Sequence, residues 1–224
     1  MARSGGLLLV GNAETGTVDV YRAASGKWLR ALGGPGAVND PTDIAVDASA
    51  GTVFVLDGRG ARVLVFDLAS GALVRTISGP GLAASDLQAP TGIAFDPARG
   101  EILVSDYGDP AMSVPPAVKL FAPDGTYLTE ISGKAGMLGQ RFSRPQGLAV
   151  DAAGRILLVD ALAGEVQVLD RATGSLQATL GGFGSGPGQL WLPLDVAIGL
   201  QGRIYVTNNR AGRVDELPAA GAGP

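Results

Sequence analysis

The chain has 224 residues, of which 46% are hydrophobic and only 5% are aromatic. Its 17 Lys and Arg against 21 Asp and Glu give a net charge of −4 with no basic cluster, which argues against a nucleic-acid-binding surface. Because both Cys and His are absent, disulfides, thiolate or imidazole metal ligands and every catalytic triad that needs His are excluded.

The earliest apolar run, Leu7 to Val10, is too short for the hydrophobic part of a signal peptide or for a membrane span. We therefore expect a soluble chain without a membrane span or an export signal of its own. The compartment stays open, and an extracytoplasmic location would require a signal upstream of Met1.

The N-terminal part predicts a unit of three β-strands, at Leu8 to Asn12, Val18 to Tyr21 and Trp28 to Gly34. Each run is short and apolar, and Gly-containing turns separate the runs, as in β-hairpins. No strand is predicted before Leu7, so this unit is expected to lack its innermost strand.

The rest of the chain repeats one pattern. Pro41-Thr-Asp-Ile-Ala-Val-Asp47 opens a unit, and similar segments with a central Ala begin at Pro90, Pro145 and Pro193. Second, third and fourth runs follow each opening segment, except that the last unit stops after its third run at Leu217. Four short strands joined by hairpins, repeating at about 50 residues, are typical of a β-propeller blade.

We therefore predict an all-β fold, a single β-propeller domain over residues 1–217 with a flexible tail at 218–224. The blade units cover about 7–40, 41–89, 90–144, 145–192 and 193–217. Three complete blades would lie between two incomplete ones. This favours an open arc, a fragment of a larger propeller or a ring completed by self-association through open blade edges.

The motifs Pro-x-Gly-Ile-Ala-Val-Asp, Gly-x-Ile-x-Val-x-Asp, Val-x-Val-Phe-Asp and a closing Ile-Ser-Gly or Leu-Gly-Gly recur in this order. The ordered set, from about residue 7 to residue 217, resembles the NHL repeat family. That resemblance implies a propeller of usually six blades with four antiparallel strands each. The chain departs from it in its incomplete ends and in the longer loop at Tyr107 to Pro116.

The loops that follow the second and fourth strands of each unit are expected on one loop-rich face, where such scaffolds carry binding sites. A polar residue ends the second strand of every unit: Asn12, Asp57, Asp106, Asp160 and Asn208. These residues are expected either to contact a ligand or a hard cation such as calcium, or to cap the following turn. The aspartates at the other hairpins are interpreted as turn-formers: Asp47, Asp67, Asp96, Asp151 and Asp170.

Asp43 and Asp195 replace the Gly of the repeat pattern near the start of the innermost strand. Lactonase-like propellers use acidic and Asn residues around a central metal, so this pair is the candidate metal site. The alternative is structural, because Asp is a common variant at this position of such repeats.

Two loops before the opening prolines add cationic and aromatic side chains, Arg141, Phe142, Arg144 and Trp191. Arg and aromatic residues are frequent hot spots of protein recognition, but Phe142 and Trp191 could instead pack between blades, as expected for Leu87. The Tyr107 to Pro116 loop, with three prolines, predicts a semi-rigid protrusion.

No convergent catalytic set is found, so a non-catalytic module is predicted that binds a protein, peptide or glycan through the loop-rich face. Two alternatives remain. One is a calcium-dependent hydrolase of the lactonase type, and the other is a fragment of a larger multidomain NHL protein. No cofactor is expected, with calcium as the one alternative.

Overall fold

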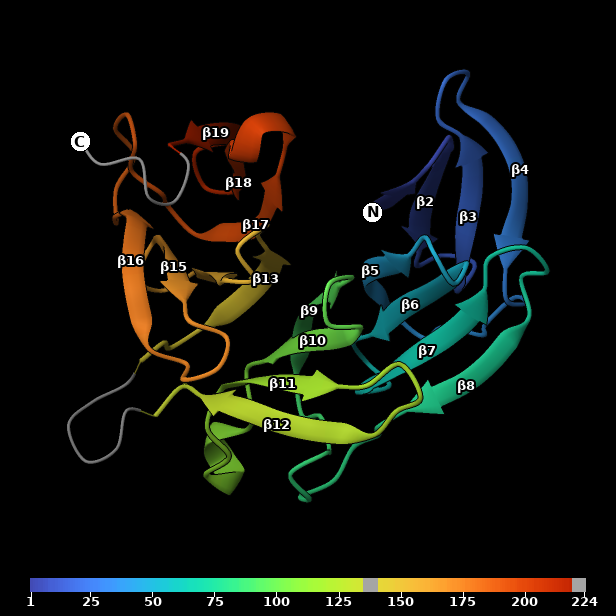
Figure 1. Ribbon diagram of the computed structural model, residues 1–224, viewed down its shortest axis with the longest axis horizontal. Helices are drawn as coiled ribbons and strands as arrows, with labels where there is room; N and C mark the ends of the chain where they lie inside the picture. Colours follow the sequence, from blue (N-terminus) through green and yellow to red (C-terminus); the bar gives the residue numbers. More distant parts are fainter. Residues whose placement is uncertain (135–140, 219–224) are drawn as a thin grey trace.

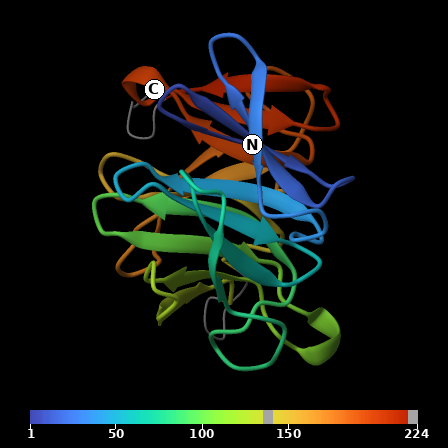
Figure 2. The same cartoon turned by 90° about the vertical axis from the view of Figure 1, so that its right-hand side faces the viewer.

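The computed structural model describes residues 1–134 and 141–218 as five antiparallel β-sheets (Figure 1). The sheets follow one another in chain order around a common axis, which is the β-propeller arrangement, and Figure 2 shows the same succession from the side. The prediction of an all-β propeller with four-stranded blades is confirmed. Among the described residues the fifth sheet has three strands.

The strands of the first sheet are β1 (Ala2–Ser4), β2 (Leu7–Asn12), β3 (Thr17–Arg22) and β4 (Lys27–Leu32). Those of the second are β5 (Pro41–Asp47), β6 (Thr52–Asp57), β7 (Arg62–Asp67) and β8 (Leu73–Ile77). Those of the third are β9 (Pro90–Asp96), β10 (Glu101–Asp106), β11 (Ala117–Phe121) and β12 (Tyr127–Ser132). Those of the fourth are β13 (Pro145–Val150), β14 (Ile156–Asp160), β15 (Glu165–Leu169) and β16 (Leu176–Gly181). Those of the fifth are β17 (Pro193–Ile198), β18 (Ile204–Asn208) and β19 (Arg213–Leu217).

The expectation that the first unit lacks an innermost strand was wrong. β1 pairs antiparallel with β2, with Ala2 opposite Leu9 and Ser4 opposite Leu7. The two strands are joined by Gly5 and Gly6, and Gly5 has a φ of 54° that suits glycine. The strand was missed because it is three residues long and carries none of the Pro-to-Asp pattern that marks the other inner strands.

The first strand of each sheet is the innermost. Residues from all five of these strands line an axial cavity of about 410 Å³, including Arg3, Ala45, Ala94, Ala149 and Ile198. The central Ala of the repeat pattern lies in this lining in the second, third and fourth sheets, where small side chains suit the crowded axis.

Four apolar clusters fill the spaces between consecutive sheets. Each contains one side chain from the loop that leads into the next sheet, three residues before the opening Pro and at most 1% exposed: Val38, Leu87, Phe142 and Leu190. The packing interpretation is therefore correct for Phe142. It is wrong for Trp191, because the neighbouring Leu190 occupies the equivalent position.

The five sheets form an open arc. Inner strands contact each other in sequence, β1 with β5, β5 with β9, β9 with β13 and β13 with β17. Within the described residues, no comparable contact joins the first sheet to the fifth, and Figure 1 shows these two sheets at opposite ends of the arc. The flexible tail predicted for 218–224 falls almost wholly outside the described residues.

The loop from Tyr107 to Pro116 contains a short 3-10 helix, η1 (Pro110–Met112), and projects from the sheets in Figures 1 and 2. The carboxylate of Asp109 accepts hydrogen bonds from the amides of Ala111 and Met112 at 2.8 and 3.2 Å. Backbone hydrogen bonds between Asp109 and Val114 close the loop at its base. The predicted semi-rigid protrusion is thus an ordered turn.

We predict that Phe142→Ala lowers the free energy of unfolding by about 3–5 kcal/mol, because the substitution opens a cavity between the third and fourth sheets. The matched control is Phe183→Ala, at a phenylalanine that is 64% exposed against 1% for Phe142. Its effect should stay within about 0.5 kcal/mol. Urea unfolding of both variants measures the difference, and equal losses would contradict the assigned packing role.

Candidate binding face

Four of the five polar residues that end the second strands are buried, and Asn12 is partly buried. Asp57, Asp106, Asp160 and Asn208 are each at most 1% exposed. Their side chains form hydrogen bonds with the loops around them, so each of these buried polar groups has a hydrogen-bond partner inside the fold. The prediction that these four residues also contact a ligand stays a prediction.

Asp106 shows the arrangement most fully. Its carboxylate accepts a hydrogen bond from the amide of Gly108 at 2.9 Å, which caps the turn after β10. It also accepts hydrogen bonds from the amides of Gln88 and Ala89 at 2.8 and 2.9 Å, in the loop that enters the third sheet. One carboxylate therefore ties together two loops of the loop-rich face.

The same bonds recur in the other sheets. Asp160 accepts hydrogen bonds from the amides of Ser143 and Arg144 and from those of Leu162 and Ala163. Asp57 binds the amides of Asp40 and Gly60 and pairs with Arg62 at 2.9 Å. These hydrogen bonds show that the residues cap the turns, which was one of the two roles predicted for them from the sequence. Asn12, at the end of β2, caps its turn through the amides of Glu14 and Thr15.

Asn208 holds Trp191 in place. The amide of Trp191 donates to the Asn208 side-chain oxygen at 2.8 Å, and the Asn208 nitrogen donates to the carbonyl of Gln189 at 3.0 Å. The indole is 44% exposed. Leu192, between Trp191 and the opening proline, has a φ of 55°, a strained conformation for this residue type that often marks functional loops.

Three loops around Trp191 are joined by backbone hydrogen bonds. Gly182 donates to Gly164 at 3.0 Å, and Arg210 donates to Trp191 at 3.1 Å. Phe183 lies against Gly164, where a Cβ would come within 2.8 Å of the Phe183 Cα. These contacts link the loops 161–164, 182–192 and 209–212 into one surface.

That surface presents large apolar side chains to solvent. Leu162 and Phe183 are each 64% exposed, beside the half-exposed Trp191 and the exposed Arg210. We call Leu162, Phe183 and Trp191 the apolar loop cluster. Sequence reasoning found only Trp191, because Leu162 and Phe183 are single apolar residues in Gly-rich loops that carry no periodic signal.

The other predicted binding residues lie on neighbouring loops and are not brought into this cluster. Tyr107 is 37% exposed at the start of the η1 loop, and Arg144 is exposed between the third and fourth sheets. The guanidinium of Arg141 is directed toward the backbone at Gly174, so this side chain is half-buried. Gln140, the residue before Arg141 in the sequence, lies outside the described residues.

The hairpin aspartates are turn-formers, as predicted. Asp47, Asp67, Asp96, Asp151 and Asp170 all accept hydrogen bonds from amides two to four residues ahead. Bonds to the side chain and amide of Ser70 hold the pKa of Asp67 below its usual value. These carboxylates stabilise turns on the face opposite the apolar loop cluster.

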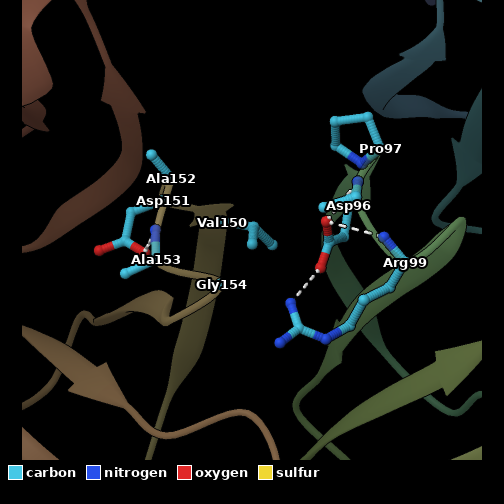
Figure 3. Close-up of a pocket in the computed structure, with 9 residues that line it drawn as sticks. Asp96, Pro97, Arg99, Val150, Asp151, Ala152, Ala153 and Gly154 are labelled. Atoms are coloured by element: carbon cyan, nitrogen blue, oxygen red, sulfur yellow. Dashed lines mark hydrogen bonds and ion pairs between the residues drawn. The ribbon is translucent and has the colours of Figure 1, made fainter.

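A cavity of about 540 Å³ opens on that opposite face, between the turns after β9 and β13 (Figure 3). Its charged side chains are paired with near neighbours in the chain. Arg99 binds Asp96 at 3.0 Å, and Asp151 binds Arg155 at 2.7 Å. Both ion pairs lie within the turns that line the cavity, where they stabilise those turns.

Asp43 and Asp195 approach each other at the axis, beside the glycines that hold the same position in the third and fourth sheets. A Cβ on Gly147 would come within 2.1 Å of the Asp195 carboxylate, and one on Gly92 within 2.8 Å of the Gln146 carbonyl. The inner strands are thus too close here for a side chain at either glycine. Asp43 accepts hydrogen bonds from the amides of Ile44 and Ile93 at 2.8 and 2.9 Å.

Burial raises the pKa of Asp43 to about 6, and the nearby charge of Asp195 acts in the same direction. The two amide hydrogen bonds and the N-terminal ammonium oppose this rise. Burial also raises the pKa of Asp195. Within the described parts of the chain, no group of three or more acidic side chains could hold a metal ion, and the expectation that this pair binds calcium stays a prediction.

We predict that the free energy of unfolding falls as pH rises, because Asp43 ionises. Its pKa is about 6 in the folded chain, and about 4 is usual for an unfolded Asp. The folded state therefore binds the extra proton between these values, and up to about 3 kcal/mol is lost on going from pH 4 to pH 7. Urea unfolding of wild type and Asp43→Asn across this range should show the variant gaining relative stability as pH rises. A constant difference would contradict the shift.

No protein-family model matches the chain, and no curated protein matches it. Among solved structures, it is similar to a chain in a structure described as a nidogen/laminin complex. The two share 20% identity with a TM-score of 0.70, over 94% of this chain and 71% of the other. No helix among the described residues is long and apolar enough to cross a membrane. At this level of identity the structural similarity shows the fold, a β-propeller, and the resemblance to the NHL repeat family stays a prediction from the sequence motifs.

Proposed function

We propose that the chain is a non-catalytic, NHL-type β-propeller module that binds a protein or peptide through its loop-rich face. The observation that carries the proposal is the apolar loop cluster, three large side chains of which two are 64% exposed. Exposed apolar groups that gather on one surface mark interaction sites, whereas scattered ones do not.

The composition of this surface supports a protein or peptide ligand. Trp191 and Arg210 belong to the residue types that contribute most to protein interfaces, and Leu162 and Phe183 add apolar area beside them. The structural neighbour is described as part of a complex between two proteins, in agreement with this use of the fold. A glycan ligand would also stack on Trp191, and the experiment below separates the two.

The rigidity of the three loops supports binding without large rearrangement. The amide of Trp191 is fixed by Asn208, and its carbonyl accepts the Arg210 amide. A surface held in its binding conformation loses less conformational entropy when the ligand binds. The buried polar residues of the predicted site would therefore act by positioning the exposed ones.

The prediction of a calcium-dependent hydrolase centred on Asp43 and Asp195 is a separate proposal, which a thermal-shift titration with calcium tests. The prediction that the chain is a fragment of a larger NHL protein also stays open. Neither of these two predictions depends on the apolar loop cluster.

Panning a random peptide library against the purified chain tests the proposed function. We expect enriched peptides whose affinity falls at least about tenfold for Trp191→Ala and for Phe183→Ala, as for hot-spot residues. The matched control is Trp28→Ala, at a tryptophan 53% exposed on β4, away from these loops. Enriched peptides that are insensitive to both loop variants would contradict the proposal, and binding only on a glycan array would reassign the ligand.

A further inference from the structure

The loops that carry the apolar loop cluster contain no acidic residue. Segments 161–164, 182–192 and 209–212 include neither Asp nor Glu, in a chain that has 21 of them. The single ionisable side chain in these segments is Arg210, which is exposed. Although the net charge of the chain is −4, the charge that these loops themselves carry is therefore positive.

A second exposed arginine borders the cluster at the loop of Leu162. The amide of Ala161 donates to the carbonyl of Arg144 at 3.0 Å, which fixes the Arg144 backbone beside that loop. Arg210 is held beside Trp191 by its own backbone hydrogen bond. Within residues 1–134 and 141–218, neither of these two arginines forms an ion pair.

The acidic side chains that adjoin these loops in the sequence are already bound within the fold. Asp160 is buried, and its carboxylate accepts hydrogen bonds from backbone amides on both sides of it. Glu165 is half-buried and accepts a hydrogen bond from a neighbouring side chain at 3.0 Å. Asp215 pairs with Arg213 at 2.8 Å. The two exposed arginines are therefore the charges that this surface offers to a ligand.

We propose that the ligand of the apolar loop cluster is an acidic segment of a protein or peptide, in which large apolar residues are flanked by Asp or Glu. The apolar residues contact the cluster, and the carboxylates pair with Arg144 and Arg210. Arginine binds carboxylates through parallel N–H···O bonds, and complementary charge selects among partners. This inference rests on the proposed function and specifies the chemistry of its ligand.

Two peptide libraries panned against the purified chain test the proposal. Both have the same random core, and they differ in their flanks, which are glutamates in the first and glutamines in the second. Each enriched peptide is then made with both kinds of flank, and its affinity is measured by fluorescence anisotropy. We expect glutamate flanks to bind at least about fivefold more tightly at low salt, as for two exposed ion pairs. High salt should remove most of this difference, because it screens exposed charges.

Variants of the chain locate the charge pairing. Arg210→Gln should lower the ratio of the two affinities, and adding Arg144→Gln should bring the ratio near one. Binding of the glutamine-flanked peptides should stay unchanged, because the apolar loop cluster is intact.

The matched control is Arg59→Gln, at an exposed arginine that lies as far beyond the end of β6 as Arg210 lies beyond the end of β18. It removes the same charge from the second sheet and should leave the ratio as in wild type. All three arginines are exposed, so thermal unfolding of every variant should be nearly unchanged.

The outcomes separate this inference from the proposed function. Peptides that need Trp191 and Phe183 but bind equally with either flank would overturn the acidic ligand and leave the proposed function standing. Failure to enrich peptides, or enriched peptides that bind Trp191→Ala as they bind wild type, would overturn both. A DNA oligonucleotide or polyglutamate that binds as tightly, without needing Trp191, would also overturn the inference, because the ligand would then be any polyanion.

Discussion

Buried polar side chains at the ends of the second strands of the second to fifth sheets hold this propeller's loop-rich face together. Asp106 binds the turn that follows its own strand and the loop that enters its sheet from the preceding one. Without it, three amides would lose their acceptor, one buried at Gly108 and two part-buried at Gln88 and Ala89, and an unsatisfied group that is fully buried costs about 1–3 kcal/mol. The same loop carries Leu87, whose burial fills the space between two sheets. Polar capping and apolar packing therefore stabilise the same junction.

This arrangement explains how a regular scaffold presents an irregular surface. Once the loop backbone is fixed by Asp160 and Asn208, the side chains that do not pack inward are directed to solvent. Leu190 fills the gap between the fourth and fifth sheets, and the adjacent Trp191 is exposed. Exposed loop side chains can thus vary from loop to loop, while the buried residues that position the loops recur in the second to fifth sheets.

The repeat made the fold predictable, because four strand patterns in a fixed order identify a blade without knowledge of its neighbours. Prediction from the sequence was less accurate for single loop residues, whose burial or exposure follows no repeating pattern. Packing between blades was the alternative for both Phe142 and Trp191, and the structure shows that Leu190, not Trp191, is the residue buried before the fifth sheet. Phe183 was missed because a lone aromatic in a Gly-rich loop has no pattern. The proximity of Asp43 and Asp195 depends on how the sheets close around the axis, which local sequence does not encode.

The open ends of the arc obey the same physical rules as its interior. β1 was missed because three residues carry too little pattern, yet it supplies the first sheet with an inner strand. At the other end, the register of β19 matches the third strands of the complete sheets. Its Val214 is exposed because the equivalent valines of the other sheets pack against a following sheet, and none follows β19 among the described residues.

Amide hydrogen exchange on Asp106→Ala tests most directly the claim that buried caps order the loop-rich face. We expect the protection of the Gln88, Ala89 and Gly108 amides to fall sharply, with a loss of roughly 3 kcal/mol in the free energy of unfolding. Asp124→Ala, at an exposed turn aspartate, should leave these amides unchanged. Unaltered protection of the three amides in Asp106→Ala would show that the loops are ordered by something else and would contradict the account.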